Sequence, residues 1–175
     1  MKSKVIKCSL SERSIDNAIK EITQYKWSLS DKLIRLRDEV GSRLAQLAQR
    51  GFDVGIADET VEGGPVTANV EVHLDSSGDI TVVYTKGEDA VWCEFGSGVY
   101  FNGSVGTSPH PRGAELGLTI GSYGEGRGKK QIWCFKDGDD IVWTHGVPAS
   151  MPMYKAFETV IYEIADIAKE VFAND

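Results

Sequence analysis

An apolar stripe between Ile15 and Leu47 constrains the fold of this chain more than any other feature. Isoleucines recur at helical spacing at positions 15, 19 and 22, and a second run continues in steps of three or four residues: Leu29, Leu33, Leu36, Val40, Leu44 and Leu47. Side chains at such spacing share one face of an α-helix. We therefore expect residues 10–50 to be helical, either as two consecutive helices or as one long bent helix. A coiled-coil seam is the alternative to a core-facing stripe, but it needs more heptads than this segment offers.

Local signals predict where this helical segment begins, breaks and ends. Ser9 and Glu12 match the capping box, in which a serine is followed three residues later by a glutamate. Ser28 and Asp31 give a second capping signal inside a polar break. Gly51 stands where a helix stop is expected.

Two later regions have the pattern of β-hairpins. In the first, residues 66–95, apolar and polar side chains alternate over 66–74 and a β-rich run returns at 80–84. Residues 90–95 are expected to be a short strand or a single helical turn. The second hairpin is expected over 131–145. Because hairpins pair antiparallel strands, the helices and strands together predict the α+β class, with a small antiparallel β-sheet.

A C-terminal amphipathic helix is expected over 151–173, with Ser150 as its N-cap and Pro152 in its first turn. Its apolar stripe consists of Met153, Phe157, Val160, Ile161, Ile164, Ala168, Val171 and Phe172. We expect this stripe and that of the first helix to pack on both hairpins within a single domain, 1–175. Phe157→Ala would then cost about 3–5 kcal/mol if that ring is fully buried.

Residues 96–130 are expected to form a long glycine-rich loop. Ten of the 33 residues from 96 to 128 are glycine. Loops of this length without structure of their own are usually functional or disordered. Because the segment also contains Tyr100, Phe101 and Tyr123, we expect it to gain contacts on binding. The alternative is a plain flexible insertion.

Charge is distributed unevenly along the chain. The net charge of −7 disfavours non-specific nucleic-acid binding, which depends on Lys and Arg. Residues 53–94 hold ten acids and one base, and residues 137–175 hold eight acids and two bases, whereas residues 112–136 hold five bases and two acids. Such blocks favour surfaces that meet an opposite charge, including another copy of the chain. The alternative is an ordinary solvated surface.

No catalytic, cofactor or metal motif is found. The glycine run 121–130 lacks the spacing of a P-loop, and the cysteines and histidines lack metal-ligand spacing. Cys93 with His110 or His145 would be a thiol nucleophile, but a Cys in such an apolar run is usually a small buried hydrophobe. Glu94 would be a general acid without an evident second carboxylate. The sequence therefore predicts no catalytic residue, no cofactor and no metal.

The same composition bears on location. The sequence contains no run of 18 apolar residues, so neither a transmembrane helix nor a membrane partner is expected. The N-terminus lacks the apolar region of a signal peptide. Three cysteines without a C-x-x-C pair favour a reducing compartment.

Several short motifs follow one another in the second half of the chain. The first is the run 94–100, Glu-Phe-Gly-Ser-Gly-Val-Tyr. After it come His110-Pro111, the loop 122–126, the strand start Ile132-Trp133 and the helix start 148–156, Pro-Ala-Ser-Met-Pro-Met-Tyr-Lys-Ala. These motifs, in this order, resemble a family of tailed-phage proteins, variously called minor capsid, head–tail joining, neck or tail-completion proteins, whose E-F-G-[TS]-G motif is similar to the first run. The resemblance covers roughly residues 90–172.

The resemblance implies a non-enzymatic structural role in the virion. It implies a small antiparallel sheet packed by a long N-terminal helical segment and a C-terminal helix. It also implies a six-fold ring of copies at the head–tail joint, assembled in the bacterial host cytoplasm. Its partners would be further copies of itself, connector or head-completion proteins, and tail-tube or tail-terminator proteins, with genomic DNA passing the channel without specific binding. The alternatives are a non-viral α+β protein-binding module and a small hydrolase.

The hypothesis also names interface residues. They combine the E-F-G motif with the aromatic and basic side chains that follow it. These residues are Glu94, Phe95, Gly96, Tyr100, Phe101, Arg112, Tyr123, Arg127, Lys129 and Lys130.

Overall fold

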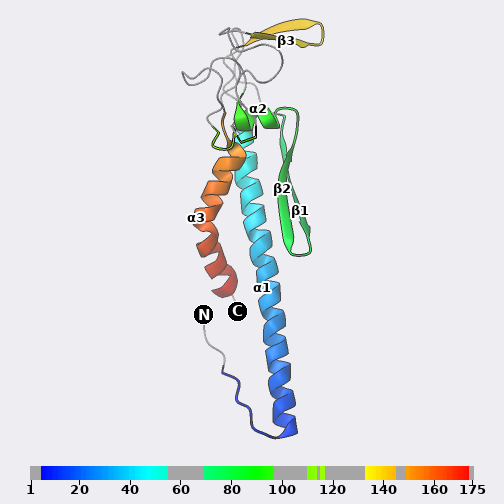
Figure 1. The fold of residues 1–175 in the computed structure, drawn as a ribbon, viewed down its shortest axis with the longest axis vertical. Helices are drawn as coiled ribbons and strands as arrows, with labels where there is room; N and C mark the ends of the chain where they lie inside the picture. The colour runs from blue at the N-terminus through cyan, green and yellow to red at the C-terminus, as the bar shows by residue number, and fades with distance from the viewer. Residues whose placement is uncertain are drawn as a thin grey trace.

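The computed structural model describes residues 5–54, 69–96, 110–113, 115–116, 133–144 and 149–173. Its elements are α1 (Glu12–Asp53), β1 (Glu71–Ser77), β2 (Ile80–Lys86), α2 (Ala90–Phe95), β3 (Trp133–Asp137), β4 (Asp140–Thr144) and α3 (Pro152–Ala173). Helix α3 and the β1–β2 hairpin lie beside the C-terminal half of α1, and the N-terminal half of α1 extends beyond them (Figure 1). The predicted α+β class is confirmed.

α1 is one continuous helix of 42 residues, about 63 Å long at a rise of 1.5 Å per residue. Its N-cap is Ser11. The Ser9 hydroxyl does not cap the helix and lies 3.2 Å from the Ser11 hydroxyl. The predicted capping box of Ser9 and Glu12 is therefore wrong. The predicted break at Ser28–Asp31 is also wrong. Because the apolar repeat passes through these residues at unbroken helical spacing, the helix continues.

α3 packs antiparallel to the C-terminal half of α1 (Figure 1). Near the middle of the contact, Arg43 donates two hydrogen bonds to the Glu163 carboxylate, at 2.8 and 2.9 Å. At the far end of α3, the Lys32 ammonium lies 6.0 Å from the centroid of the Phe172 ring. α3 therefore covers α1 as far as Lys32.

Two glycines of α1 let its neighbours approach closely. A Cβ at Gly51 would lie 2.7 Å from the Cβ of Pro152, and one at Gly41 would lie 2.7 Å from the Thr81 Cγ2. Both distances are shorter than any ordinary contact. The helix continues past Gly51 to Asp53, so the predicted stop is wrong, and the glycine instead serves the packing of α1 on α3.

The β1–β2 hairpin lies along α1 and is joined to it by side chains of the helix. Its strands pair antiparallel from Glu71 opposite Lys86 to Ser77 opposite Ile80. Gln49 of α1 accepts a hydrogen bond from the Val72 N–H at 2.7 Å and donates to the Val70 carbonyl at 3.1 Å. The glutamine amide thus extends the hydrogen bonding of the strand edge onto the helix.

β3 and β4 form a second antiparallel pair, separate from the first hairpin. β1 and β2 pack against α1, whereas α3 packs against α1 and α2. The expectation that both helices pack on both hairpins is therefore wrong in this arrangement. The physical reason is that α3 and the β1–β2 hairpin occupy different sides of α1.

Among the described residues, a cluster of buried apolar side chains lies at the C-terminal end of α1. It consists of Phe52, Val70, Ala90 and Cys93, with Val72 and Met153 packed against it. This core joins the end of α1, the start of β1, helix α2 and the start of α3.

The predicted apolar stripe of α3 is only partly buried. Val160 is buried, and so is Ala156 beside it, whereas Phe157 is 53 % exposed. The condition attached to Phe157→Ala, full burial of the ring, is therefore not met. Ile161 and Ile164 are exposed in the same way.

Candidate functional site: a buried carboxylate–imidazole cluster

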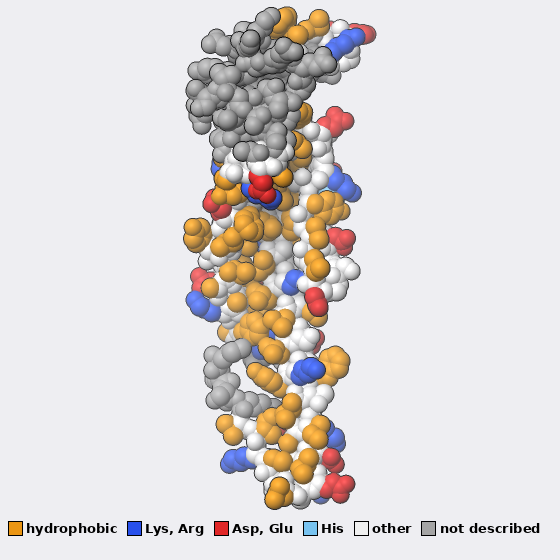
Figure 2. Space-filling model, viewed as in Figure 1, with side chains coloured by type: hydrophobic (Ala, Val, Ile, Leu, Met, Phe, Trp, Pro, Cys, Tyr) orange, Lys and Arg blue, Asp and Glu red, His pale blue; other side chains and the backbone are white. Residues whose placement is uncertain are grey.

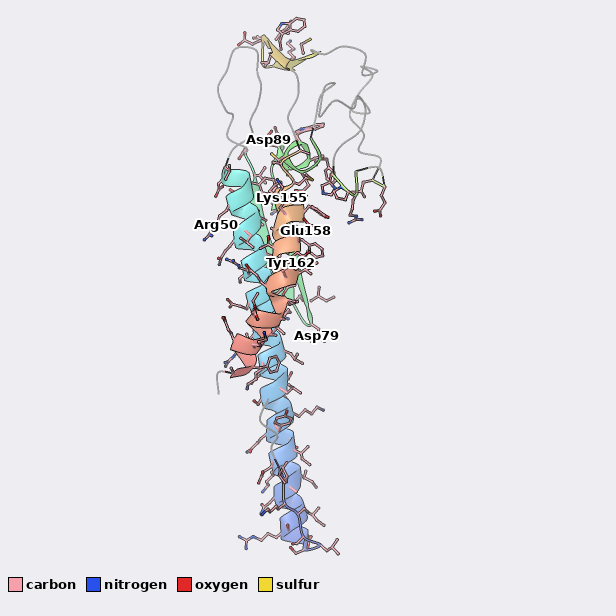
Figure 3. All side chains as sticks on the ribbon, turned by 90° about the vertical axis from the view of Figure 1, so that its left-hand side faces the viewer. Arg50, Asp79, Asp89, Lys155, Glu158 and Tyr162 are labelled. Atoms are coloured by element: carbon pink, nitrogen blue, oxygen red, sulfur yellow. The ribbon has the colours of Figure 1, made fainter. Side chains whose placement is uncertain are left out.

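The most elaborate cluster of polar groups lies where α2, the turn at 110–113 and the start of α3 meet. In Figure 3, Asp89 marks the residue before α2, and Lys155, Glu158 and Tyr162 mark the course of α3 away from this junction. Glu94 and His110 are the two buried polar or charged residues of the described part of the chain. Such groups are rarely buried unless they are paired.

Glu94 caps α3 from a distant part of the sequence. Its Oε2 accepts the Met153 N–H and its Oε1 accepts the Tyr154 N–H, both at 2.9 Å. These two N–H groups belong to the first turn of α3, where no intrahelical acceptor exists. A carboxylate is favoured here by the positive end of the helix dipole.

His110 completes the coordination of the carboxylate. Its Nδ1 accepts the Arg112 N–H at 3.1 Å. Because that nitrogen acts as an acceptor, the proton of the neutral ring is on Nε2, which donates to the Glu94 Oε1 at 3.1 Å. The ring also contacts Phe95, with centroids 4.4 Å apart, and Tyr154, with centroids 5.2 Å apart.

The Cys93 carbonyl binds the segment that leads into α3. It accepts the Ser150 N–H at 2.9 Å, the Met151 N–H at 3.2 Å and the Ser150 hydroxyl at 3.0 Å. Ser150 was predicted to be the N-cap of α3, and that is wrong because its hydroxyl is used here. Met151 adopts a left-handed backbone conformation, with φ of 54°, which non-glycine residues rarely do.

Gly96 ends α2 with φ of 80° and ψ of 165°. Such a combination is open to glycine and strained for other residues. Its N–H donates to the Trp92 carbonyl at 2.8 Å. The backbone conformation therefore accounts for Gly96, the third residue of the E-F-G motif. The cap on α3 accounts for Glu94, the first.

The Cys93 thiol is not arranged as a nucleophile. The side chain is buried, and burial together with the nearby Asp89 carboxylate raises the pKa of the thiol to about 11. A reactive cysteine needs the opposite shift, since the thiolate is the nucleophile. The Glu94 carboxylate is not arranged as a general acid either, because each of its oxygens already accepts a backbone N–H. The cluster is thus suited to holding elements together.

The predicted interface residues fall into three groups. Glu94 and Gly96 are buried within the chain and Phe95 is half-buried, so the E-F-G residues serve internal packing. Arg112 is exposed and forms an ion pair with Glu115 at 3.2 Å. The remaining members lie outside the described residues: Tyr100, Phe101, Tyr123, Arg127, Lys129 and Lys130. The glycine-rich loop predicted over 96–130 lies outside them too, apart from Gly96, 110–113 and 115–116.

Sequence reasoning missed two residues of structural importance. The sequence pattern gives Gln49 no role, although its amide pairs with the edge of β1. The Asp89 carboxylate accepts the Asn69 N–H at 2.9 Å and so fixes the entry to β1. Neither partner lies close in sequence, so no local pattern could have identified these contacts.

Within the described residues, no group of three or more His, Cys, Asp or Glu side chains is placed to hold a metal ion. None of the helices in that part of the chain is long and apolar enough to cross a lipid bilayer. No protein-family model matches the chain, and no curated protein or solved structure is significantly similar to it.

Proposed function

We propose that this chain is a structural virion protein of a tailed bacteriophage or prophage, which forms a ring at the head–tail junction and joins the tail to the head. The proposal starts from the resemblance of residues 90–172 to the neck and tail-completion proteins. It is supported by where the motif residues lie. Glu94, His110 and the helix start at 151–154 come from separate motifs, yet they contact one another in one buried cluster.

This cluster is the observation that carries the proposal. A chance match of short motifs would not require their residues to meet in the fold. Here the E-F-G glutamate caps the Met-Pro-Met-Tyr helix, and the histidine of the His-Pro motif binds that glutamate. This meeting of the motif residues supports the resemblance.

The surface of the chain supports an assembled state. Large apolar side chains are exposed along the N-terminal half of α1, along α3 and on β2 (Figure 2). Exposed apolar patches of this kind mark interaction sites. A ring requires contacts between unlike surfaces that close on themselves. The proposed partners are further copies of the chain, connector or head-completion proteins, and tail-tube or tail-terminator proteins.

The charge of the chain fits a place beside the DNA channel. A net charge of −7 repels phosphate, so genomic DNA would pass without specific binding. The role is structural and non-enzymatic, in the virion neck or tail after assembly in the bacterial host cytoplasm. A small hydrolase gains no support from the cluster, because the Glu94 oxygens and the Cys93 thiol are engaged or protonated.

The exposed apolar side chains also favour a second candidate, an α+β protein-binding module outside a virion. That candidate predicts a stable small complex with one soluble partner protein. The two candidates are separated by where the protein is found.

The test removes the gene from the phage or prophage and examines the particles by electron microscopy. We expect unattached tails and leaking heads, restored to joined particles by the wild-type gene supplied in trans. Mass spectrometry of purified particles is expected to detect the protein as a stoichiometric component. Normal tailed particles without the gene, or particles that lack the protein, would contradict the proposal.

A further inference from the structure

The N-terminal part of α1 carries an apolar stripe that no other described element covers. We call residues Glu12–Asp31 the arm, because α3 ends beside Lys32. Ile15, Ile19 and Ile22 form the arm stripe and are 41 %, 55 % and 56 % exposed. This stripe continues the apolar repeat that runs along α1 to Leu47. Apolar side chains lie along this extended part of the molecule (Figure 2).

α3 carries a second uncovered stripe, which lies beside the face that packs on α1. Phe157, Ile161 and Ile164 form this outer stripe, and each is about half exposed. The two stripes have the same spacing, since both step by four and then by three residues. Side chains at this spacing interdigitate when two helices pack side by side.

The dimensions and charges of the two surfaces also match. The arm has 20 residues and α3 has 22, so the two helices match in length. Lys26 takes the next position along the arm stripe, and Glu158 flanks the outer stripe. An antiparallel register that sets Ile22 against Ile161 puts Lys26 opposite Phe157, one residue from Glu158. The opposite charges of Lys26 and Glu158 then lie near each other.

We propose that the arm of one copy packs against the outer stripe of α3 in a second copy of this chain. One kind of contact then covers both stripes, whereas pairing of arm with arm would leave the outer stripe exposed. Each copy gives an arm and receives one, so the contact is heterologous and repeats around a ring. The inference rests on the self-assembly in the proposed function and names the surfaces that perform it.

Disulfide trapping between two variants tests the contact in purified full-length protein. Cys8→Ser and Cys134→Ser remove the two exposed thiols, and the buried Cys93 is kept. Ile22→Cys is made in one sample and Ile161→Cys in another, and the two are mixed over a concentration series under mild oxidation. We expect a disulfide-linked dimer in the mixture and none in either sample alone.

Two matched cysteines on other faces serve as controls. Gln24→Cys lies on the opposite side of the arm and Thr159→Cys on the opposite side of α3 from the outer stripe, and neither is expected to cross-link in the same mixtures. A dimer formed by Ile22→Cys alone would overturn the proposal in favour of arm–arm pairing. No cross-link in the mixture at any concentration would overturn it as well.

Charge exchange gives a second readout by analytical ultracentrifugation. Lys26→Glu is expected to weaken association about two- to five-fold, the range of an exposed ion pair, and addition of Glu158→Lys is expected to restore it. No restoration would overturn the antiparallel register. Both tests use purified protein and no phage, so a failure here is distinct from a failure of the particle experiment.

Discussion

Glu94 and Met153 are 59 residues apart in the sequence, yet a Glu94 carboxylate oxygen accepts the Met153 backbone N–H at 2.9 Å. The other oxygen binds Tyr154 and His110. One side chain therefore ties α2 and the turn at 110–113 to the start of α3. This connection gives the E-F-G motif a physical role in the fold.

Glu94→Gln is expected to lower the free energy of unfolding by about 2–3 kcal/mol, the range of hydrogen bonds to a charged group. The amide keeps the shape of the side chain but turns one acceptor into a donor that faces N–H groups. Urea denaturation measures the loss. Glu158→Gln, an exposed change on α3, is the control, and an equal effect of the two variants would contradict the role of Glu94 as a cap.

Gly51→Ala is expected to destabilise the protein, although the same change in an open helix stabilises by about 1 kcal/mol. The added Cβ would lie 2.7 Å from the Pro152 Cβ, and relieving such overpacking costs about 1–3 kcal/mol. Thermal melts check the sign, with exposed Ser30→Ala as a control. A rise in Tm for Gly51→Ala would show that α3 does not approach α1 this closely.

Val160→Ala is expected to destabilise the folded chain more than Phe157→Ala does. Val160 is buried and its truncation is expected to cost about 2 kcal/mol. Truncation of the Phe157 ring is expected to cost under about 1 kcal/mol, since about half of the ring is exposed in the chain. Denaturant melts of both variants measure the two losses in the free energy of unfolding. A larger loss for Phe157→Ala than for Val160→Ala would place the Phe157 side of α3 in the core.

Cys93 is expected to resist alkylation in the folded protein. With a pKa raised to about 11 by burial, only about a thousandth of the thiol is ionised at pH 8. Iodoacetamide is expected to modify the exposed Cys8 and Cys134, and Cys93 only after denaturation. Mass spectrometry of the intact protein counts the adducts, and rapid triple modification of the native chain would show that Cys93 is accessible.

Much of the secondary structure follows from local pattern. The stripe from Ile15 to Leu47 predicts a helix because residues three and four apart are neighbours on its surface. The alternation over 66–74 and the run at 80–84 predict the first hairpin in the same local way. Its strands are β1 (Glu71–Ser77), which runs three residues further than predicted, and β2 (Ile80–Lys86). Residues 66–68 lie outside the described residues. The helical turn that was one alternative for 90–95 is confirmed as α2.

The candidate site was only partly accessible to such reasoning. The resemblance drew attention to Glu94, Phe95 and Gly96, but as interface residues. Their internal role depends on His110 and on the first turn of α3, which are brought near only by folding. A side chain that caps a distant helix leaves no periodic trace in the sequence.

The sequence by itself determined which segments are helices and hairpins, because these choices depend on contacts within a few residues. The tertiary structure alone decided which apolar side chains are buried. Val160 and Phe157 belong to the same predicted stripe, but α1 is narrow and covers only the side of α3 that carries Val160. It also decided that Gly51 is a contact point and that Glu94 is a cap, since both roles need a partner about 60 to 100 residues away that only packing brings into reach.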